Sequence, residues 1–310
     1  MFVQNEKKIL LLGGTGRLGS AFNFQFKKDN IEYLSPKKDE LNLLDRKSIE
    51  LYLSKTKPSF IINCAGLSIL DICEREKEKS RILNFELIKI LNIYSTETKA
   101  ILLTFSTDYV FDGLSSPDHS YSETDEKKPL SIYGSHKSDM EDYLLTEGKN
   151  FFIIRISSLY GVGINNFVFK GLKNLIQKKG ETIEIVDDEF ISPSLNLDVA
   201  SFSIFLLNQN NKNYGCYNFF SYEGCYRYDF FMKLKQNFIT FLETYNFAYK
   251  DINPIKTSRL FFESSSLRPK NSSLNCRKLE SNDNYLNFIQ FKRENELIFF
   301  RHLLKDDLKI

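Results

Sequence analysis

The sequence predicts an α/β fold: a doubly wound parallel sheet followed by a smaller C-terminal lobe. Short, continuously apolar runs alternate with amphipathic stretches of helical length through the first part of the 310 residues. Such alternation is typical of parallel strands that are covered by helices on both faces. After about residue 160 the alternation loosens. We therefore expect a larger domain over residues 1–220, with an excursion toward the substrate around 161–195, and a smaller substrate-binding lobe over 221–310.

The expected elements follow one another in chain order. Apolar runs predict strands within residues 7–13, 31–35, 58–66, 100–107, 150–161, 181–188 and 215–221. Helical spacing predicts helices within residues 14–28, 44–57, 80–99, 165–180 and 196–209, and one more that begins near residue 131. In such a sheet, ligands bind at the carboxyl ends of the strands.

Composition excludes several classes of function. With 42 Lys and Arg against 40 Asp and Glu, the net charge is +2 and evenly spread. This leaves no electrostatic footprint for nucleic acid or an acidic membrane. The five cysteines form no CxxC pair and only three histidines accompany them, so neither a disulfide framework nor a metal site is predicted. The apolar run near the N-terminus is too short to span a membrane, and we expect a cytoplasmic protein.

Three glycines mark the first strand-to-helix junction. Gly13, Gly16 and Gly19 form a GxxGxxG turn. The first glycine permits a tight turn, the second lets the backbone approach a pyrophosphate, and the third lets the helix pack closely against the strand. At the first βα turn of an alternating chain, this motif predicts a Rossmann-type dinucleotide site.

The end of the second expected strand bears on the choice of cofactor. Ser35 stands where an acidic residue commonly binds the adenosine ribose, and Lys37 and Lys38 follow it. Together with Arg17 in the glycine turn, these cations favour the 2′-phosphate of NADPH over NADH. The alternative interpretation, that these side chains simply face water, stays open at this point.

Tyr133 and Lys137 lie four residues apart at the start of an expected helix, so their side chains share one face. A free phenol has a pKa of about 10. An ammonium about 4 Å away, at an effective dielectric of about 20, stabilises the phenolate by about 4 kcal/mol, which would lower the pKa of the tyrosine by roughly three units. Thr107 and Asp108 end a buried strand and would present a hydroxyl and a carboxyl at the same edge of the sheet.

These motifs, in this order, resemble the extended short-chain dehydrogenase/reductases and, more narrowly, the dTDP-4-dehydrorhamnose reductase family. The glycine turn is followed by "STDYVFDG" at 106–113, "ETDEKKPLSIYG" at 123–134 and "YGSHK" at 133–137, and "LRPKNSSLNCRKL" at 267–279 corresponds to that family's late RPxNSxL segment. The similarity covers nearly the whole chain.

The resemblance implies a role for each matching position. Tyr133 would be the general acid, Lys137 would lower its pKa and bind the nicotinamide ribose, and Thr107 with Asp108 would hold the sugar. The remaining cofactor contacts would come from Gly16, Arg17 and Leu18 at the pyrophosphate, Asn42 and Leu43 near the adenine, and Gly66, Leu67 and Ser68 in the third βα turn. The substrate would be a nucleotide sugar, and a homodimer is compatible with the resemblance.

The chain departs from the family pattern at two places. The family's "RTSW" reads "RISS" at 155–158, so Ser158 replaces a tryptophan that packs against the sugar. Ser20 and Ala21 follow the glycine turn where members with Mg²⁺ carry an acid, so no metal is predicted. The sequence therefore leaves the sugar and the nucleotide open.

Two alternative functions remain at this point. An epimerase or dehydratase of the same fold would use the same tyrosine and lysine, although the late RPxNSxL-like segment argues against it. A non-catalytic relative, like the regulatory β-subunit of methionine adenosyltransferase, would bind NADP without turnover. Asn84 is either a side chain that hydrogen-bonds the backbone near the site or an ordinary exposed helix residue.

Overall fold

The computed structural model describes residues 8–177, 182–209, 212–261, 266–280 and 285–304. Its main sheet has six strands in the order β1-β2-β3-β4-β7, with β8 also paired to β4, and every pair is parallel. The predicted doubly wound α/β fold is confirmed. The strands are β1 (Ile9–Leu12), β2 (Phe60–Asn63), β3 (Ile101–Thr107), β4 (Phe151–Tyr160), β7 (Pro193–Leu195) and β8 (Gly215–Phe219).

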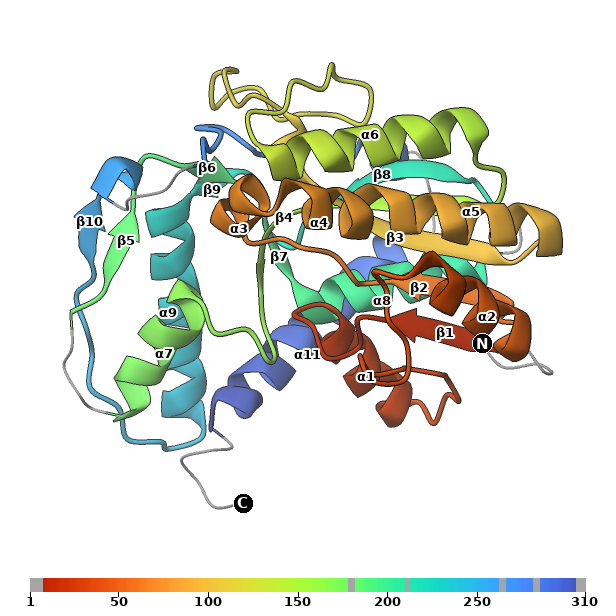
Figure 1. Cartoon of the computed structure of the whole chain (residues 1–310). Helices are drawn as coiled ribbons and strands as arrows, with labels where there is room; N and C mark the ends of the chain where they lie inside the picture. Colours follow the sequence, from red (N-terminus) through yellow and green to blue (C-terminus); the bar gives the residue numbers. More distant parts are fainter. Residues whose placement is uncertain (1–7, 178–181, 210–211, 262–265, 281–284, 305–310) are drawn as a thin grey trace.

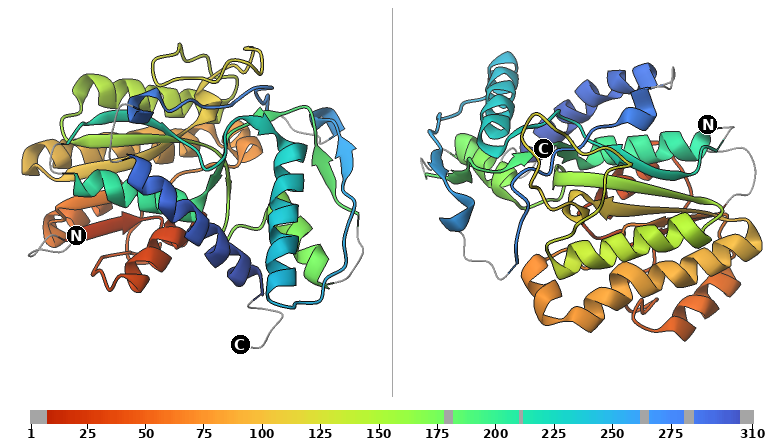
Figure 2. Two further views of the ribbon diagram at one scale, coloured as in Figure 1. Left: turned by 180° about the vertical axis from the view of Figure 1, so that it is seen from behind. Right: turned by 90° about the horizontal axis from the view of Figure 1, so that it is seen from above.

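Helices cover both faces of the sheet (Figures 1 and 2). Alternate residues of a strand point to opposite faces. Leu10 and Leu12 accordingly pack in the core with α2 (Arg46–Thr56), α5 (Leu87–Thr98) and α6 (Ile132–Glu147). Ile9 and Leu11 pack instead in the core that includes α1 (Gly19–Lys28), α8 (Asn196–Asn208) and α11 (Tyr285–Leu304).

The prediction of a strand over residues 31–35 is wrong, because the segment pairs at one residue only. Only Leu34 pairs with β1, as an isolated bridge to Leu10 with backbone hydrogen bonds to Ile9 and Leu11, each 2.8 Å long. Pro36 follows almost at once, and proline has no N–H with which to extend a ladder. The segment therefore covers the sheet edge at one residue.

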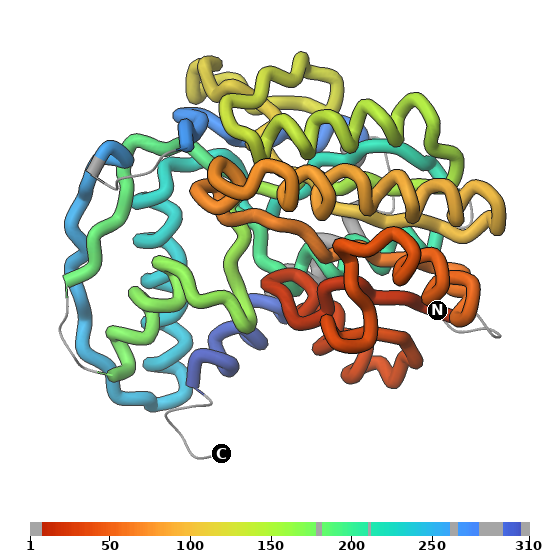
Figure 3. Tube along the Cα trace, viewed as in Figure 1, coloured from red at the N-terminus to blue at the C-terminus, as the bar shows by residue number. Residues whose placement is uncertain are grey.

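A second group of elements lies beside the main sheet, on the left in Figures 1 and 3. It packs α7 (Phe167–Gln177) against α9 (Arg227–Thr244) and pairs β5 (Glu184–Val186) with β10 (Ile255–Thr257) in parallel. Both α7 and β5 come from the 161–195 segment. The end of the helix expected at 165–180 lies outside the described residues.

The shorter elements are β6 (Phe190–Ile191), β9 (Cys225–Tyr226), α3 (Leu70–Arg75), α4 (Lys77–Arg81), η1 (Ile82–Glu86), η2 (Asp108–Val110), η3 (Arg259–Phe261) and α10 (Arg277–Glu280).

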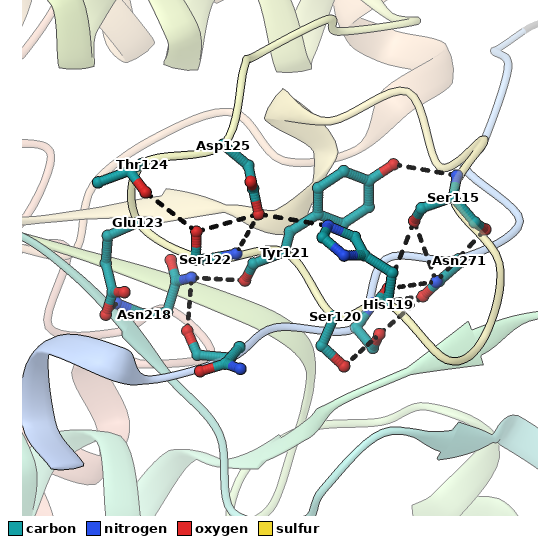
Figure 4. A network of polar contacts seen from close by, with 12 residues as sticks. Ser115, His119, Ser120, Tyr121, Ser122, Glu123, Thr124, Asp125, Asn218 and Asn271 are labelled. Carbon is teal, nitrogen blue, oxygen red and sulfur yellow. Dashed lines mark hydrogen bonds and ion pairs between the residues drawn. The ribbon is translucent and has the colours of Figure 1, made fainter.

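Residues 266–276, called here the late segment, join distant parts of the chain. Isolated bridges pair Leu274 with Tyr121 on one side and Asn271 with Phe190 on the other. The side-chain amide of Asn271 also donates to two carbonyls of the facing loop, at 2.7 and 2.9 Å (Figure 4). These contacts hold the late segment between Phe190 and the loop at 113–122. Within the described helices, none combines the length and apolar character that crossing a bilayer requires.

Candidate active site

A cleft of about 580 Å³ lies at the carboxyl ends of β1 to β4. Its walls come from the turn after β1, the turn after β2, the end of β3, the start of α6 and the end of β4. The cleft brings together eleven of the residues predicted from sequence: Gly16, Arg17, Leu18, Gly66, Leu67, Ser68, Thr107, Asp108, Tyr133, Lys137 and Ser158.

The three glycines of the first turn play different structural parts. Gly13 has a φ of +73°, and a Cβ there would lie 2.6 Å from the Ala65 nitrogen. A Cβ on Gly19 would lie 2.1 Å from the Gly13 carbonyl oxygen. These two glycines therefore shape the turn and let α1 pack against it, while Gly16 lines the cleft itself. The parts of Gly13 and Gly19 are those that the motif predicts, and contact of Gly16 with a pyrophosphate stays a prediction.

Three other predicted cofactor residues lie off the cleft. Ser35 packs on the back of the glycine turn, where a Cβ on Gly14 would meet its Oγ at 2.2 Å. Asn42 is exposed, and its Oδ1 accepts the backbone N–H of Leu44 at 3.0 Å. Leu43 packs on the edge of the core beneath α2 and α5. Their contacts with an adenine or its ribose remain predictions.

Tyr133 and Lys137 enter the cleft from the first turns of α6. The helix begins here because Ser131 caps it, with Oγ accepting the backbone N–H of Gly134 at 3.1 Å. Lys137 is 5% exposed, and its Nζ donates to the Phe105 carbonyl at 3.0 Å. Burial lowers the pKa of Lys137 to about 8, and the carboxylate of Glu141 partly offsets that effect.

The pKa of Tyr133 differs from the sequence expectation. Burial raises it, the negative charge of Asp108 raises it further, and the nearby hydroxyl of Thr107 lowers it in part. Burial and the carboxyl that the fold places nearby outweigh the effect of an ammonium beside the phenol. A phenol in this state keeps its proton at neutral pH, as a general acid must.

Thr107 and Asp108 lie at the end of β3, and both are buried. The Thr107 hydroxyl donates to Oδ1 of Asp108 at 2.9 Å, and the Ser157 hydroxyl donates to Oδ2 at 2.7 Å. Burial raises the pKa of Asp108 to about 6, although hydrogen bonds from neighbouring hydroxyls lower it in part. The carboxyl of Asp108 is therefore engaged within the protein.

Ser158 lies at an irregular point of β4. Its φ is +40°, in the left-handed region that disfavours side chains with a Cβ, and the pairing of β4 with β7 shifts register between Ser157 and Leu159. The shift turns Ser158 into the wall of the cleft. Where the family pattern has an aromatic side chain, this chain therefore has the small hydroxyl side chain of Ser158 on strained backbone.

Further polar residues line the cleft: the sequence left the place of Asn84 open and did not indicate Asn63 or Arg268. Asn63 ends β2, Asn84 lies in the π-helical segment η1, and Arg268 comes from the late segment. Among the described residues, Nε of Arg268 has no hydrogen-bond partner. Arg268 stands in the RPxNSxL-like motif at 267–279, but no local pattern in the sequence indicates that this motif reaches the cleft.

The residues that line the cleft fit a nicotinamide dinucleotide. The turn offers backbone at Gly16 without a side chain, and Gly66 leaves room beside Asn84, whose Oδ1 would lie 2.8 Å from a Cβ at that position. Ser106, also in the cleft wall, is buried, and its Oγ has no hydrogen-bond partner among the described residues. Unpaired buried polar groups are rare in folded proteins, and a ligand bound in the cleft would supply a partner for this one.

Comparison with known families decides the classification. The RmlD substrate binding domain family matches residues 7–293. The chain belongs to this family. The predicted resemblance to the extended short-chain dehydrogenase/reductases, and within them to the dTDP-4-dehydrorhamnose reductases, is confirmed.

Relatives within and around the RmlD family include both enzymes and a subunit. The chain is 28% identical to dTDP-4-dehydrorhamnose reductase of Aggregatibacter actinomycetemcomitans, over 88% of this chain and 92% of that protein. It is 27% identical to methionine adenosyltransferase 2 subunit beta of Xenopus laevis, over 89% and 82%. Its fold matches dTDP-4-dehydrorhamnose reductase from Bacillus anthracis, solved with NADP, with a TM-score of 0.78 at 24% identity over 94% and 99% of the chains.

Proposed function

We propose that this RmlD-family protein reduces the 4-keto group of a nucleotide-activated 6-deoxy sugar with NAD(P)H, and that the reaction is dTDP-4-dehydrorhamnose to dTDP-L-rhamnose. The observation that carries the proposal is the convergence of Tyr133, Lys137 and Thr107 on one cleft beside the glycine turn. The reductase from Aggregatibacter supports the reaction class, since the similarity spans nearly both chains.

Each side chain has a part in the proposed reaction. The bound nicotinamide supplies the hydride. Tyr133 donates a proton to the oxygen that becomes the 4-hydroxyl, and its raised pKa keeps that proton available at neutral pH. Lys137, charged below its pKa of about 8, stabilises the phenolate that remains. Thr107 and Ser158 face the sugar.

The glycine turn and the turn after β2 hold the cofactor in this proposal. Gly16, Arg17 and Leu18 lie at the pyrophosphate, and Gly66, Leu67 and Ser68 face the nicotinamide half. Arg17 with the exposed Lys37 and Lys38 favours NADPH over NADH, and the NADP in the Bacillus anthracis structure is in line with that preference. The division into a dinucleotide-binding part over 1–220 and a substrate-binding lobe over 221–310 belongs to the same proposal.

A second candidate function comes from the similarity to methionine adenosyltransferase 2 subunit beta. That similarity covers the chain as fully as the similarity to the reductase does. A regulatory subunit would bind NADP in the same cleft without turnover. The complete set of Tyr133, Lys137 and Thr107 favours the enzyme, because each has a defined part in proton transfer.

The deciding experiment follows the absorbance of NADPH, and separately of NADH, with enzymatically generated dTDP-4-keto-6-deoxy-L-mannose as substrate. We expect oxidation of NADPH and formation of dTDP-rhamnose. Cofactor binding by fluorescence, without oxidation of this substrate or of other 4-keto sugar nucleotides, would refute the reductase and favour the regulatory subunit. Turnover of a different 4-keto sugar nucleotide would keep the reaction class and refute the sugar.

A further inference from the structure

Three hydroxyl groups converge on the buried carboxyl of Asp108. Thr107 donates to Oδ1 at 2.9 Å and Ser157 donates to Oδ2 at 2.7 Å. The hydroxyl of Ser272, in the late segment, is a third group that lowers the pKa of this carboxyl. Asp108 is 3% exposed, and these three residues are buried too. The carboxyl thus has its polar contacts inside the protein, although its residue lines the cleft.

Counting donors shows what this arrangement does to Thr107. An ionised carboxylate only accepts hydrogen bonds, and a threonine hydroxyl has one proton to give. That proton is directed at Asp108, and the Thr107 oxygen in turn accepts the backbone N–H of Tyr109 at 3.2 Å. While Asp108 is ionised, Thr107 therefore has no proton for a substrate carbonyl.

A protonated Asp108 reverses the direction of the bond. The neutral carboxyl has one O–H of its own, which needs an acceptor, and the oxygens of Thr107 and Ser157 lie within reach. When that O–H is donated to Thr107, the threonine proton becomes free to point into the cleft. The change takes up one proton from water and forms or breaks no other covalent bond.

We infer that Asp108 is a positioning residue, whose protonation decides whether Thr107 can donate a hydrogen bond to the carbonyl oxygen of the substrate. The inference rests on the proposed function, since it assumes a carbonyl that lies against Thr107 and Tyr133. It revises the role that the family resemblance implied for Asp108, which was direct contact with the sugar.

Titration of Asp108 also affects its titratable neighbours, and none of those with a stated pKa titrates in the same pH range as Asp108. The charge of Asp108 raises the pKa of Tyr133 on α6 and that of its chain neighbour Tyr109, so protonation of Asp108 also makes Tyr133 a stronger acid. Lys137, on the same face of α6, has a pKa near 8 and stays charged while Asp108, with a pKa near 6, titrates.

The other ionisable groups near this carboxyl come from the remaining walls of the cleft. Arg268 of the late segment lines the cleft. Asp71 of α3 lines the same cleft, and Cys73 of α3 raises the pKa of Tyr133. Behind Tyr109, Glu189 and Arg227 form an ion pair. Asp108 is hydrogen-bonded directly to Thr107, so its titration decides where the hydroxyl proton of Thr107 points.

The test measures kcat against pH for the reduction, with cofactor and substrate saturating. In the wild-type protein we expect kcat to fall about tenfold as pH rises through the pKa of Asp108, because one hydrogen bond to the developing alkoxide is lost. Asp108→Asn should lack this step, and Ser157→Ala should move it to higher pH, since a donor that stabilises the carboxylate is gone. The exposed Asp142→Asn is the matched control and should keep the wild-type step.

An infrared titration of the same proteins gives a readout that needs no turnover. The carbonyl band of a protonated carboxyl should appear as pH falls through about 6, vanish in Asp108→Asn and shift to higher pH in Ser157→Ala. An unchanged pH profile in Asp108→Asn, or an infrared titration that Ser157→Ala leaves in place, overturns the role of Asp108. Absence of turnover in the wild-type protein overturns the proposed function instead, and the infrared titration then decides whether Asp108 and Ser157 are coupled as inferred.

Discussion

The side-chain amide of Asn84 holds the backbone of Leu67 at both of its polar groups. Oδ1 accepts the Leu67 N–H at 3.1 Å, and Nδ2 donates to the Leu67 carbonyl at 2.9 Å. Asn84 is fully buried and lies in the π-helical segment η1, a kind of segment that is frequent at functional sites. Of the two interpretations left open by the sequence, the structure supports the one that places Asn84 against the backbone near the site.

Asn84→Ala should weaken both folding and cofactor binding. The N–H of Leu67 loses its partner in a part-buried position, and its carbonyl keeps only the Cys73 thiol, so the change costs about 1–3 kcal/mol of unfolding free energy. We expect the Kd for NADPH to rise about tenfold, because the turn that lines the cleft is no longer held. Denaturant unfolding and fluorescence titration measure the two effects.

Asn84→Asp keeps the acceptor for the Leu67 N–H, so its stability and NADPH affinity should lie between those of the wild-type protein and the alanine variant. Wild-type NADPH affinity in the alanine variant would contradict this role.

Arg155→Met should destabilise the protein strongly. Arg155 forms two hydrogen bonds with Glu141, at 2.9 and 2.7 Å, and the two side chains are 2% and 0% exposed. Removing one partner of a buried pair costs about 3–5 kcal/mol. We expect the lower end, since Lys127 still lies 3.4 Å from Glu141.

The double variant Arg155→Met/Glu141→Leu is the control for that effect. It removes both charges, so most of the lost stability should return. Denaturant midpoints of the three proteins, at constant slope, measure the difference. A double variant no more stable than the single one would show that shape, rather than the unpaired charge, dominates at this site.

Activity and stability should respond to alkaline pH in opposite directions. The pKa of Lys137 is lowered to about 8 in the folded protein, against about 10.4 for an exposed lysine. Between these values the unfolded chain binds a proton that the folded chain does not, so this group makes the stability rise with pH. The charge that stabilises the Tyr133 phenolate is lost over the same range, so kcat should fall.

Paired profiles of kcat and Tm from neutral pH upward test this expectation. A fall in kcat without a fall in Tm identifies a titration inside the site rather than unfolding. Lys137→Met, which cannot titrate, should show low activity with no step near the pKa of Lys137. A wild-type kcat that stays level well above that pKa would contradict the role given to the ammonium.

Tyr133→Phe should reduce turnover by about two or more orders of magnitude and leave cofactor binding nearly intact. The change removes the hydroxyl that donates the proton and keeps the ring. NADPH oxidation and fluorescence titration measure the two quantities separately. Retained activity in this variant would refute Tyr133 as the acid. Ser135→Ala, on the same helix turn but outside the cleft, serves as the matched control.

Local patterns in the sequence were enough for the sheet, the glycine turn and the shared face of Tyr133 and Lys137. Continuous apolar runs, three glycines at fixed spacing and a separation of four residues each act over one element. Their physics is contained in a few consecutive residues. The strand expected at 31–35 shows the limit of such patterns, because Pro36 and the position at the sheet edge decided how much of it pairs.

Only the tertiary structure decided the chemistry around Asp108. Its hydrogen-bond partners Thr107 and Ser157 come from β3 and β4, and Ser272, which also lowers its pKa, comes from the late segment; these parts lie far apart in the sequence. The pKa values of Tyr133 and Asp108 depend on burial, which no single segment determines. Sequence named the groups that could react, and packing of distant segments set the state of their protons, because desolvation and hydrogen bonding act through space rather than along the chain.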